Sequence, residues 1–166
     1  MVTNGIRVAT TVIQAAQPTG AATRTMLQVA TPTTEGLYIV EWGISFDGSV
    51  AAAPIKVELF NCTGAATMST TLAATDISRL SEPLGTETIP LQYSTALTAF
   101  ATGAVTEGTV ANAYMHDLQY IAPTSQYVKQ WPLGREPSIA LSTFERIRVT
   151  AAATVNCFCY IVFGSA

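Results

Sequence analysis

Apolar residues recur at every second position in segment after segment of this chain, and this period of two constrains the fold most. In the longest such run, the side chains expected on one buried face are Tyr38, Val40, Trp42, Ile44 and Phe46. Residues 55–59 and 147–151 show the same alternation, with polar or charged residues between the apolar ones. Side chains alternate across a strand, whereas a helix needs apolar residues three or four positions apart. The pattern therefore predicts an all-β chain.

The number and spacing of these segments indicate two packed antiparallel sheets. About eight to ten short strands follow one another, separated by turn-forming residues. The last run, residues 154–163, is apolar on both faces, which is typical of a strand that is central in its sheet or covered on its outer side. A length of 166 residues suits one domain. We expect a single β-sandwich domain over residues 1–166, with a jelly roll as the arrangement that fits eight strands in two sheets.

Two segments carry more specific predictions. Asp47-Gly48 directly follows the strand of residues 37–46 and is a strong signal for a tight hairpin, so residues 55–59 after Pro54 are predicted as the return strand. Residues 62–108 lack the regular alternation, are rich in Ala, Thr and Gly, and show one weak helical stretch near residues 71–80. We expect a long irregular excursion there, packed on the sandwich or on an adjoining subunit.

The composition narrows the possible partners. Charged residues make up 11% of the chain and the formal net charge is −3, compared with about 25% charged residues in an average soluble domain. Nucleic-acid binding, which depends on neutralising phosphates, is not expected. No apolar run is long enough to span a membrane, and the amino terminus lacks the apolar region of a classical secretory signal. The neutral surface suggests instead that another protein covers part of it.

Candidate catalytic and metal-binding residues are few. His116 is the only histidine, and neither a nucleophile motif nor a phosphate-binding loop accompanies it. Cys157 and Cys159 would face the same side of a strand, and Cys62 with His116 would complete a possible zinc set. The apolar residues around Cys157 and Cys159 favour buried, unreactive thiols. We therefore predict no enzyme activity, no catalytic residue, no cofactor and no metal.

The segment Trp131–Pro137 is the clearest candidate for a protein interface. Two prolines and a glycine restrict its backbone, and Trp131 and Arg135 are residue types enriched at interface hot spots. The alternative is a rigid loop whose tryptophan packs into its own sandwich. The predicted interface residues are Trp131, Leu133 and Arg135 in this loop, with Phe158 and Tyr160 on the outer face of the last strand.

Several runs of residues resemble those of small structural proteins of tailed bacteriophages, namely head decoration (cement) proteins and related minor capsid components. The runs are residues 36–48 (GLYIVEWGISFDG), 131–137 (WPLGREP), 146–153 (RIRVTAAA), 155–156 (VN) and the aromatic-rich end at Phe163. The resemblance implies a jelly-roll-like virion protein that sits on the major capsid protein lattice, commonly as a homotrimer, and stabilises the shell. It implies assembly in the host cytoplasm, which agrees with reduced cysteines, and carries over no catalytic residue.

Three alternatives remain open. The chain could be a receptor- or glycan-binding module of a tail or fibre, with Trp131, Tyr127 and Tyr120 stacking on sugars. It could be a hydrolase that uses His116. It could also be a shell-building capsid subunit itself, although such subunits are often larger and may carry a basic arm, which is not visible here.

Overall fold

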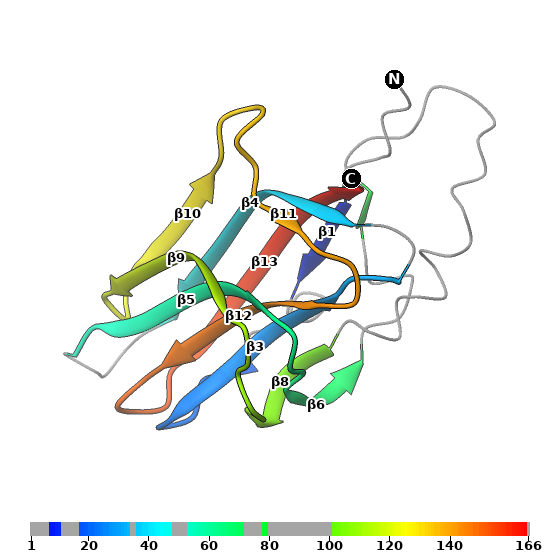
Figure 1. The fold of residues 1–166 in the computed structure, drawn as a ribbon. Coiled ribbons are helices and arrows are strands. Elements are labelled where there is room, and N and C mark those ends of the chain that lie inside the picture. Colours follow the sequence, from blue (N-terminus) through cyan, green and yellow to red (C-terminus); the bar gives the residue numbers. More distant parts are fainter. Residues whose placement is uncertain are drawn as a thin grey trace.

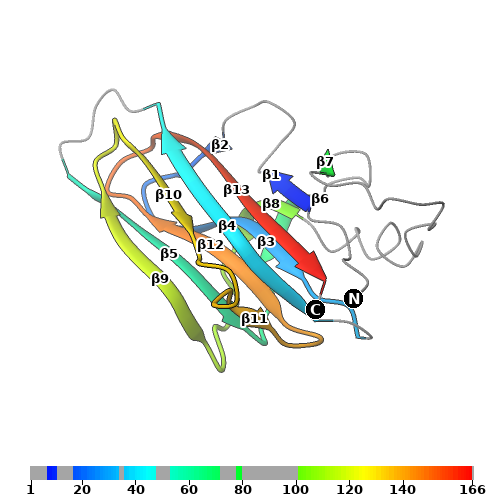
Figure 2. The same cartoon turned by 90° about the horizontal axis from the view of Figure 1, so that it is seen from above.

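The computed structural model describes residues 7–10, 17–33, 36–47, 53–71, 78–79 and 101–165, and these residues form two antiparallel sheets without a helix (Figure 1). The seven-stranded sheet contains β1 (Arg7–Thr10), β2 (Gln17–Pro18), β4 (Leu37–Phe46), β7 (Ser78–Arg79), β10 (Gln126–Gln130), β11 (Ser138–Ile139) and β13 (Asn156–Ser165). The six-stranded sheet contains β3 (Thr23–Ala30), β5 (Ile55–Cys62), β6 (Thr67–Thr71), β8 (Ala101–Thr106), β9 (Tyr114–Ile121) and β12 (Phe144–Thr150). The predicted all-β sandwich is confirmed, and Figure 2 shows its two layers from above.

Eight of the strands pair in a nested order. Four early strands, β1, β3, β4 and β5, pair antiparallel with β13, β12, β10 and β9 respectively. The sheets therefore contain the orders β10-β4-β13-β1 and β3-β12-β5-β9. A long hairpin rolled into two facing four-stranded sheets is the jelly-roll arrangement, as predicted. β13 lies between β4 and β1, so the expectation that the last strand is central is also confirmed.

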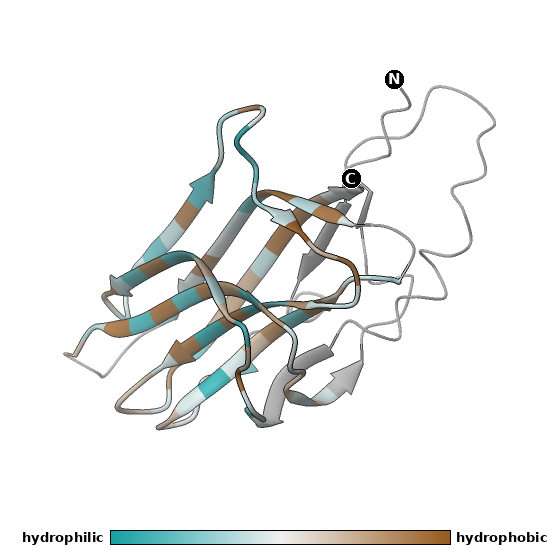
Figure 3. Cartoon of the chain, viewed as in Figure 1, coloured by the Kyte–Doolittle hydropathy of each residue, from teal (hydrophilic) through white to brown (hydrophobic). Residues whose placement is uncertain are grey.

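The core lies between the sheets and follows the period of two. Trp42, Ile55, Val57 and Leu59 are all buried there, as the alternation predicted. Along β5, brown and teal positions alternate in Figure 3, which reflects apolar side chains directed inward and polar ones directed outward.

The register of β4 differs from the prediction in its first half. Tyr38 and Val40 were expected on the face of Trp42, but Leu37 and Ile39 are the buried residues there. The pairing between β13 and β4 shifts where Val162 lies opposite Glu41 and the next residue lies opposite Ile39. This bulge inserts one extra residue into β4 and moves all the preceding side chains to the opposite faces.

The predicted hairpin at Asp47-Gly48 is wrong. β4 and β5 belong to different sheets, so the chain crosses from one layer to the other between them. Residues 48–52 lie outside the described residues. Asp47 itself is held by β13, since its backbone N–H donates to the Asn156 carbonyl at 3.2 Å and its carboxylate accepts from Asn156 Nδ2 at 2.9 Å.

The excursion over residues 62–108 is more regular than predicted. β6 and β8 pair with each other and extend the six-stranded sheet beyond β3, while β7 extends the other sheet beyond β1. The described part therefore packs on the sandwich, as expected, by continuing its sheets. Residues 71, 78 and 79 of the predicted helical stretch lie in strands. Residues 72–77 and 80–100 lie outside the described residues.

Candidate protein interface

The exposed apolar side chains of the described residues gather on one side of the sandwich. The large ones are Tyr114, Met115, Leu118, Tyr120, Val128, Leu133 and Leu141. All belong to β9, β10 or the loops on either side of β11. β9 and β10 are edge strands of the two sheets, and both figures of the whole fold place them along the same side (Figures 1 and 2). Edge strands usually carry charges that prevent association, so an apolar edge of this kind indicates a contact surface.

The loop after β10 holds its predicted residues in different environments. Trp131 is half-buried against the core, and its backbone N–H donates to the Val40 carbonyl at 3.1 Å, so the tryptophan packs into its own sandwich. Leu133, in contrast, is 98% exposed, and Arg135 is exposed without an ion pair to another described residue. The loop projects from the sandwich between β10 and β11 (Figure 1).

Local hydrogen bonds define the shape of this loop. The Arg135 N–H donates to the Pro132 carbonyl at 2.9 Å, and Gly134 between them has a positive φ of 81°, which a side chain would strain. The Ile39 N–H donates to the Pro137 carbonyl at 3.1 Å and ties the far end of the loop to β4. Leu133 is therefore presented on a well-defined turn.

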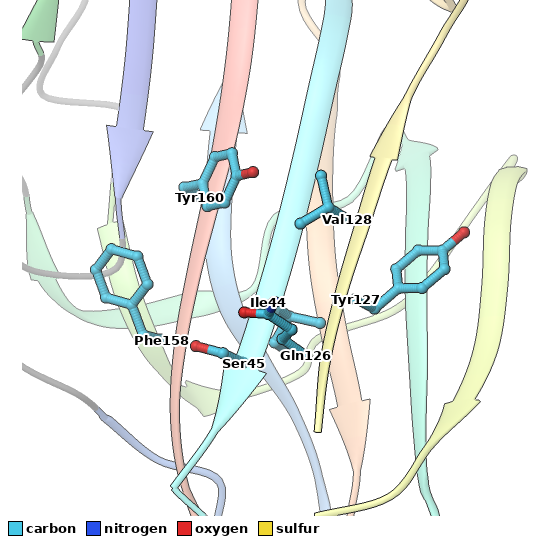
Figure 4. A pocket seen from close by; sticks show the side chains of 7 residues that line it. All are labelled: Ile44, Ser45, Gln126, Tyr127, Val128, Phe158 and Tyr160. Carbon is cyan, nitrogen blue, oxygen red and sulfur yellow. The ribbon is translucent and has the colours of Figure 1, made fainter. Parts of the chain in front are cut away.

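Phe158 and Tyr160 line a shallow depression on the outer face of the seven-stranded sheet. Its volume is about 270 Å³, and its lining residues are Ile44, Ser45, Gln126, Tyr127, Val128, Phe158 and Tyr160. Figure 4 shows both aromatic rings on β13, Val128 on β10, and Tyr127 turned away toward β9. The structure thus places Phe158 and Tyr160 together, whereas the loop residues Trp131, Leu133 and Arg135 do not line this depression.

A glycine and a carboxylate position Tyr160. A Cβ atom on Gly43 would lie 2.5 Å from Cε1 of Tyr160, so the ring rests directly over this glycine. The Tyr160 hydroxyl donates to Glu41 Oε1 at 2.6 Å. Burial and the neighbouring Glu41 carboxylate raise the pKa of Tyr160 above its ordinary value.

Around Arg146, the outer face of the six-stranded sheet is covered by the chain itself. Arg146 is fully buried there, where its Nη2 donates to Glu107 Oε2 at 2.5 Å and to Thr25 Oγ1 at 2.6 Å. Its Nη1 donates to the Gly64 carbonyl at 3.4 Å. Residues 62–66 and 106–111 lie over this face, and the Thr63 N–H joins them by donating to the Ala111 carbonyl at 3.2 Å.

The same face buries Phe60 beneath two cations. The guanidinium carbons of Arg146 and Arg148 lie 5.3 and 4.6 Å from the ring centroid of Phe60. Arg148 and Lys56 both contact the Glu58 carboxylate, at 3.0 and 2.8 Å. Burial would raise the pKa of Glu58, but these hydrogen bonds hold it below its ordinary value.

His116 lies in a bulge of the edge strand β9 and approaches a buried acid. Its Nε2 is 3.6 Å from Oε2 of Glu145, which is too long for a hydrogen bond, and neither atom has another partner among the described residues. Burial lowers the pKa of His116 and raises that of Glu145 well above its ordinary value, while Asn61 reduces the latter shift. Within the described residues, no hydroxyl group donates a hydrogen bond to His116 Nε2, as that of a hydrolytic nucleophile would.

The three cysteines do not come together. Cys157 and Cys159 face the core from β13, whereas Cys62 is on β5 of the other sheet, where its Sγ contacts the Gly64 carbonyl and accepts from Arg146. All three are buried, as predicted, and burial raises the pKa of Cys157 to about 12. Within the part of the chain that the structure describes, no group of three or more His, Cys, Asp or Glu side chains could hold a metal ion.

The aromatic residues named for the glycan-binding alternative are also dispersed. Tyr120 is on the six-stranded sheet, while Tyr127 is on the seven-stranded sheet and packs inward on Trp42, with 5.5 Å between the ring centroids. The Tyr127 hydroxyl donates to Asp117 Oδ2 of β9 at 2.8 Å and so links the two sheets. Together with the half-buried Trp131, these rings form no common platform.

Comparison of the chain with protein-family models, curated proteins and solved structures finds no match. Among the described residues, no helix has the length and apolarity needed to cross a membrane. The functional hypothesis therefore depends on the residues themselves and on the surface that they form.

Proposed function

We propose that this chain is a structural virion protein that decorates an assembled bacteriophage capsid and stabilises it through protein–protein contacts, as a homotrimer bound to the major capsid protein lattice. The observation that carries the proposal is the concentration of exposed apolar side chains between residues 114 and 141. Large apolar side chains that gather on the exposed surface of a soluble domain often mark a protein–protein contact.

The composition supports the same function. With 11% charged residues, the chain has few charges to spread over its surface, and the charged groups of the six-stranded sheet are largely used in internal pairs such as Arg146 with Glu107. Interfaces are enriched in aromatic residues and Met, and the exposed side chains on this side of the sandwich include Tyr114, Met115 and Tyr120. On a lattice, many copies that bind weakly would act together, so a modest affinity for each site would suffice to reinforce a shell.

The experiment is to add the purified protein to capsid shells that lack it and to measure binding and the temperature at which the shells break. We expect saturable binding and a higher disruption temperature. Leu118→Asp or Tyr120→Asp, on the edge strand β9, should weaken one of these contacts without unfolding the chain, because both side chains are exposed, at 40% and 68%. Shells whose binding and disruption temperature stay unchanged at high protein concentration would contradict the proposal and favour the receptor-binding alternative.

A further inference from the structure

We propose that Leu133 of one copy of this chain docks into the depression around Tyr160 of a second copy. The inference rests on the proposed function in that it names the self-association contact of the homotrimer. The proposed contact has two halves, which together contain four of the five predicted interface residues. Leu133 and Arg135 belong to the loop, and Phe158 and Tyr160 belong to the depression.

The shapes of the two halves are complementary. Leu133 is 98% exposed, so it does not occupy the depression of its own molecule. The depression, at about 270 Å³, is smaller than typical small-molecule sites of about 300–1,000 Å³, yet it has room for one branched apolar side chain. Val128 and Phe158 supply its apolar walls. Because the turn around Gly134 already holds Leu133 outward, docking costs little further ordering of the loop.

The charges of the two halves are complementary as well. Arg135 stands two residues after Leu133, within about 7 Å along an extended chain, and has no ion pair among the described residues. Glu41 lies beside Tyr160 at the rim of the depression, and no lysine or arginine lines it. When Leu133 enters, Arg135 can reach the Glu41 carboxylate of the second copy. Such a pair fixes the orientation of the contact more than its strength.

The two halves are different surfaces of the same molecule, so the contact is head-to-tail. A head-to-tail contact leaves one free loop and one free depression on every dimer, and it ends only when a ring closes. A closed ring of three copies would satisfy every loop and every depression. This geometry makes a prediction that a symmetric dimer does not share.

The test combines two variants that each destroy one half. Leu133→Asp removes the docking side chain, and Val128→Asp places a charge in the depression at a position that is 52% exposed. Leu141→Asp is the matched control, because Leu141 is similarly exposed, at 48%, but does not line the depression. Native mass spectrometry and analytical ultracentrifugation at high micromolar concentration give the oligomeric state, and circular dichroism confirms that each variant is folded.

We expect wild type and Leu141→Asp to associate, and Leu133→Asp and Val128→Asp each to be monomeric. An equimolar mixture of the two monomeric variants should form a heterodimer and nothing larger, because only one intact loop and one intact depression remain to meet. Arg135→Gln and Glu41→Gln should each weaken wild-type association by about tenfold, and the double variant should be no weaker than either single one.

Other outcomes overturn the inference. If Leu133→Asp assembles like wild type, or if the mixture of variants stays monomeric, the loop and the depression do not form the contact. If wild type is monomeric but still raises the disruption temperature of shells, the docking contact is wrong while the proposed function stands. If wild type is monomeric and leaves shells unchanged, both proposals fail. Binding of a saccharide in the depression would then support the glycan-binding alternative.

Discussion

The outer faces of the two sheets differ in how they are covered. On the six-stranded sheet, the chain returns over its own strands, and Arg146, Glu107 and Thr25 bury one another in hydrogen bonds. On the seven-stranded sheet, the described residues leave an open depression between Phe158 and Val128. Around Arg146 the six-stranded face is covered by the molecule itself, whereas the described residues of the seven-stranded face leave their depression open. The comparison shows that one buried, paired cation can hold a covering segment over the face of a sheet.

The largest expected effect separates two arginines. Arg146→Ala removes a fully buried cation and leaves Glu107 and Thr25 without their partner, which typically costs about 3–5 kcal/mol of unfolding free energy. Arg135→Ala, on the exposed loop, should stay within about 0.5 kcal/mol of wild type. Urea unfolding of both variants measures the difference. Equal losses would mean that the six-stranded face is not sealed by Arg146.

Replacing one glycine on each face with alanine compares the free energy of unfolding that tight packing contributes on the two faces. Alanine at position 64 would meet the backbone carbonyl oxygen of Thr109, so the covering segment would have to move. Gly64→Ala should therefore cost about 1–3 kcal/mol, as overpacking commonly does. Gly43→Ala meets only the Tyr160 ring, which can rotate outward toward solvent, and should cost less. Thermal unfolding ranks the two, and a larger loss for Gly43→Ala would contradict the contrast between the faces.

Adjacent residues of β12 provide a third contrast, since the buried Arg146 has many hydrogen-bond partners, whereas the geometry gives the carboxyl oxygens of the buried Glu145 none among the described residues. Glu145→Met should stabilise the protein at neutral pH by about 1–3 kcal/mol, because it removes an unsatisfied buried carboxyl. Unfolding midpoints in urea at neutral pH measure this gain. A loss of stability would show that Glu145 has a partner after all.

The pH dependence has a definite sign. The pKa of Glu145 is raised in the native state, so the stability linked to its proton is present below pH 4.5 and is lost as pH rises through the native pKa. The gain from Glu145→Met, or from the non-titrating Glu145→Gln, should therefore grow between pH 4.5 and 7. His116 acts oppositely, since its lowered pKa costs stability as pH falls below 6.5. Unfolding midpoints over this range separate the two.

The smallest effects compare two hydroxyl groups. Tyr160→Phe removes one hydrogen bond to Glu41 on the open face and should cost about 0.5–1.5 kcal/mol. Thr25→Val removes the acceptor of two Arg146 donors on the covered face and should cost more, about 1–3 kcal/mol. Matched urea titrations decide the order, and the reverse order would indicate that the open face is the more tightly organised one.

The sequence determined the faces of most strands but could not determine what lies over them. The alternation of Leu59 and Ile147 with charged neighbours correctly placed these side chains in the core. It also placed Arg146 on the outside of its sheet, yet its burial depends on Glu107, which is 39 residues away in the chain and returns by a route that local patterns do not encode.

The predictions from the sequence were wrong where a single residue sets the register of a strand or where the chain passes from one sheet to the other. The bulge in β4 reversed the faces of Tyr38 and Val40, because a single inserted residue is invisible to a period of two. The Asp47-Gly48 signal describes a turn, but it does not state in which sheet the following strand will pair. Likewise, Phe158 and Tyr160 were expected on the outer face, while Val128 joins them only because β10 is the neighbour of β4, a fact of strand order.

The nested strand order also has a consequence in time. Arg7 of β1 lies opposite Phe163 of β13, so the first described strand waits for almost the whole chain before its neighbour β13 exists. At ordinary synthesis rates of about 5–20 residues per second, that wait is roughly 10–30 seconds on the ribosome. Distant pairings of this kind also close slowly, in milliseconds to seconds after release. Throughout that interval β1 lacks the neighbour with which it forms its longer pairing, so we expect the yield of this protein in cells to depend on translation speed and temperature more than its final stability does.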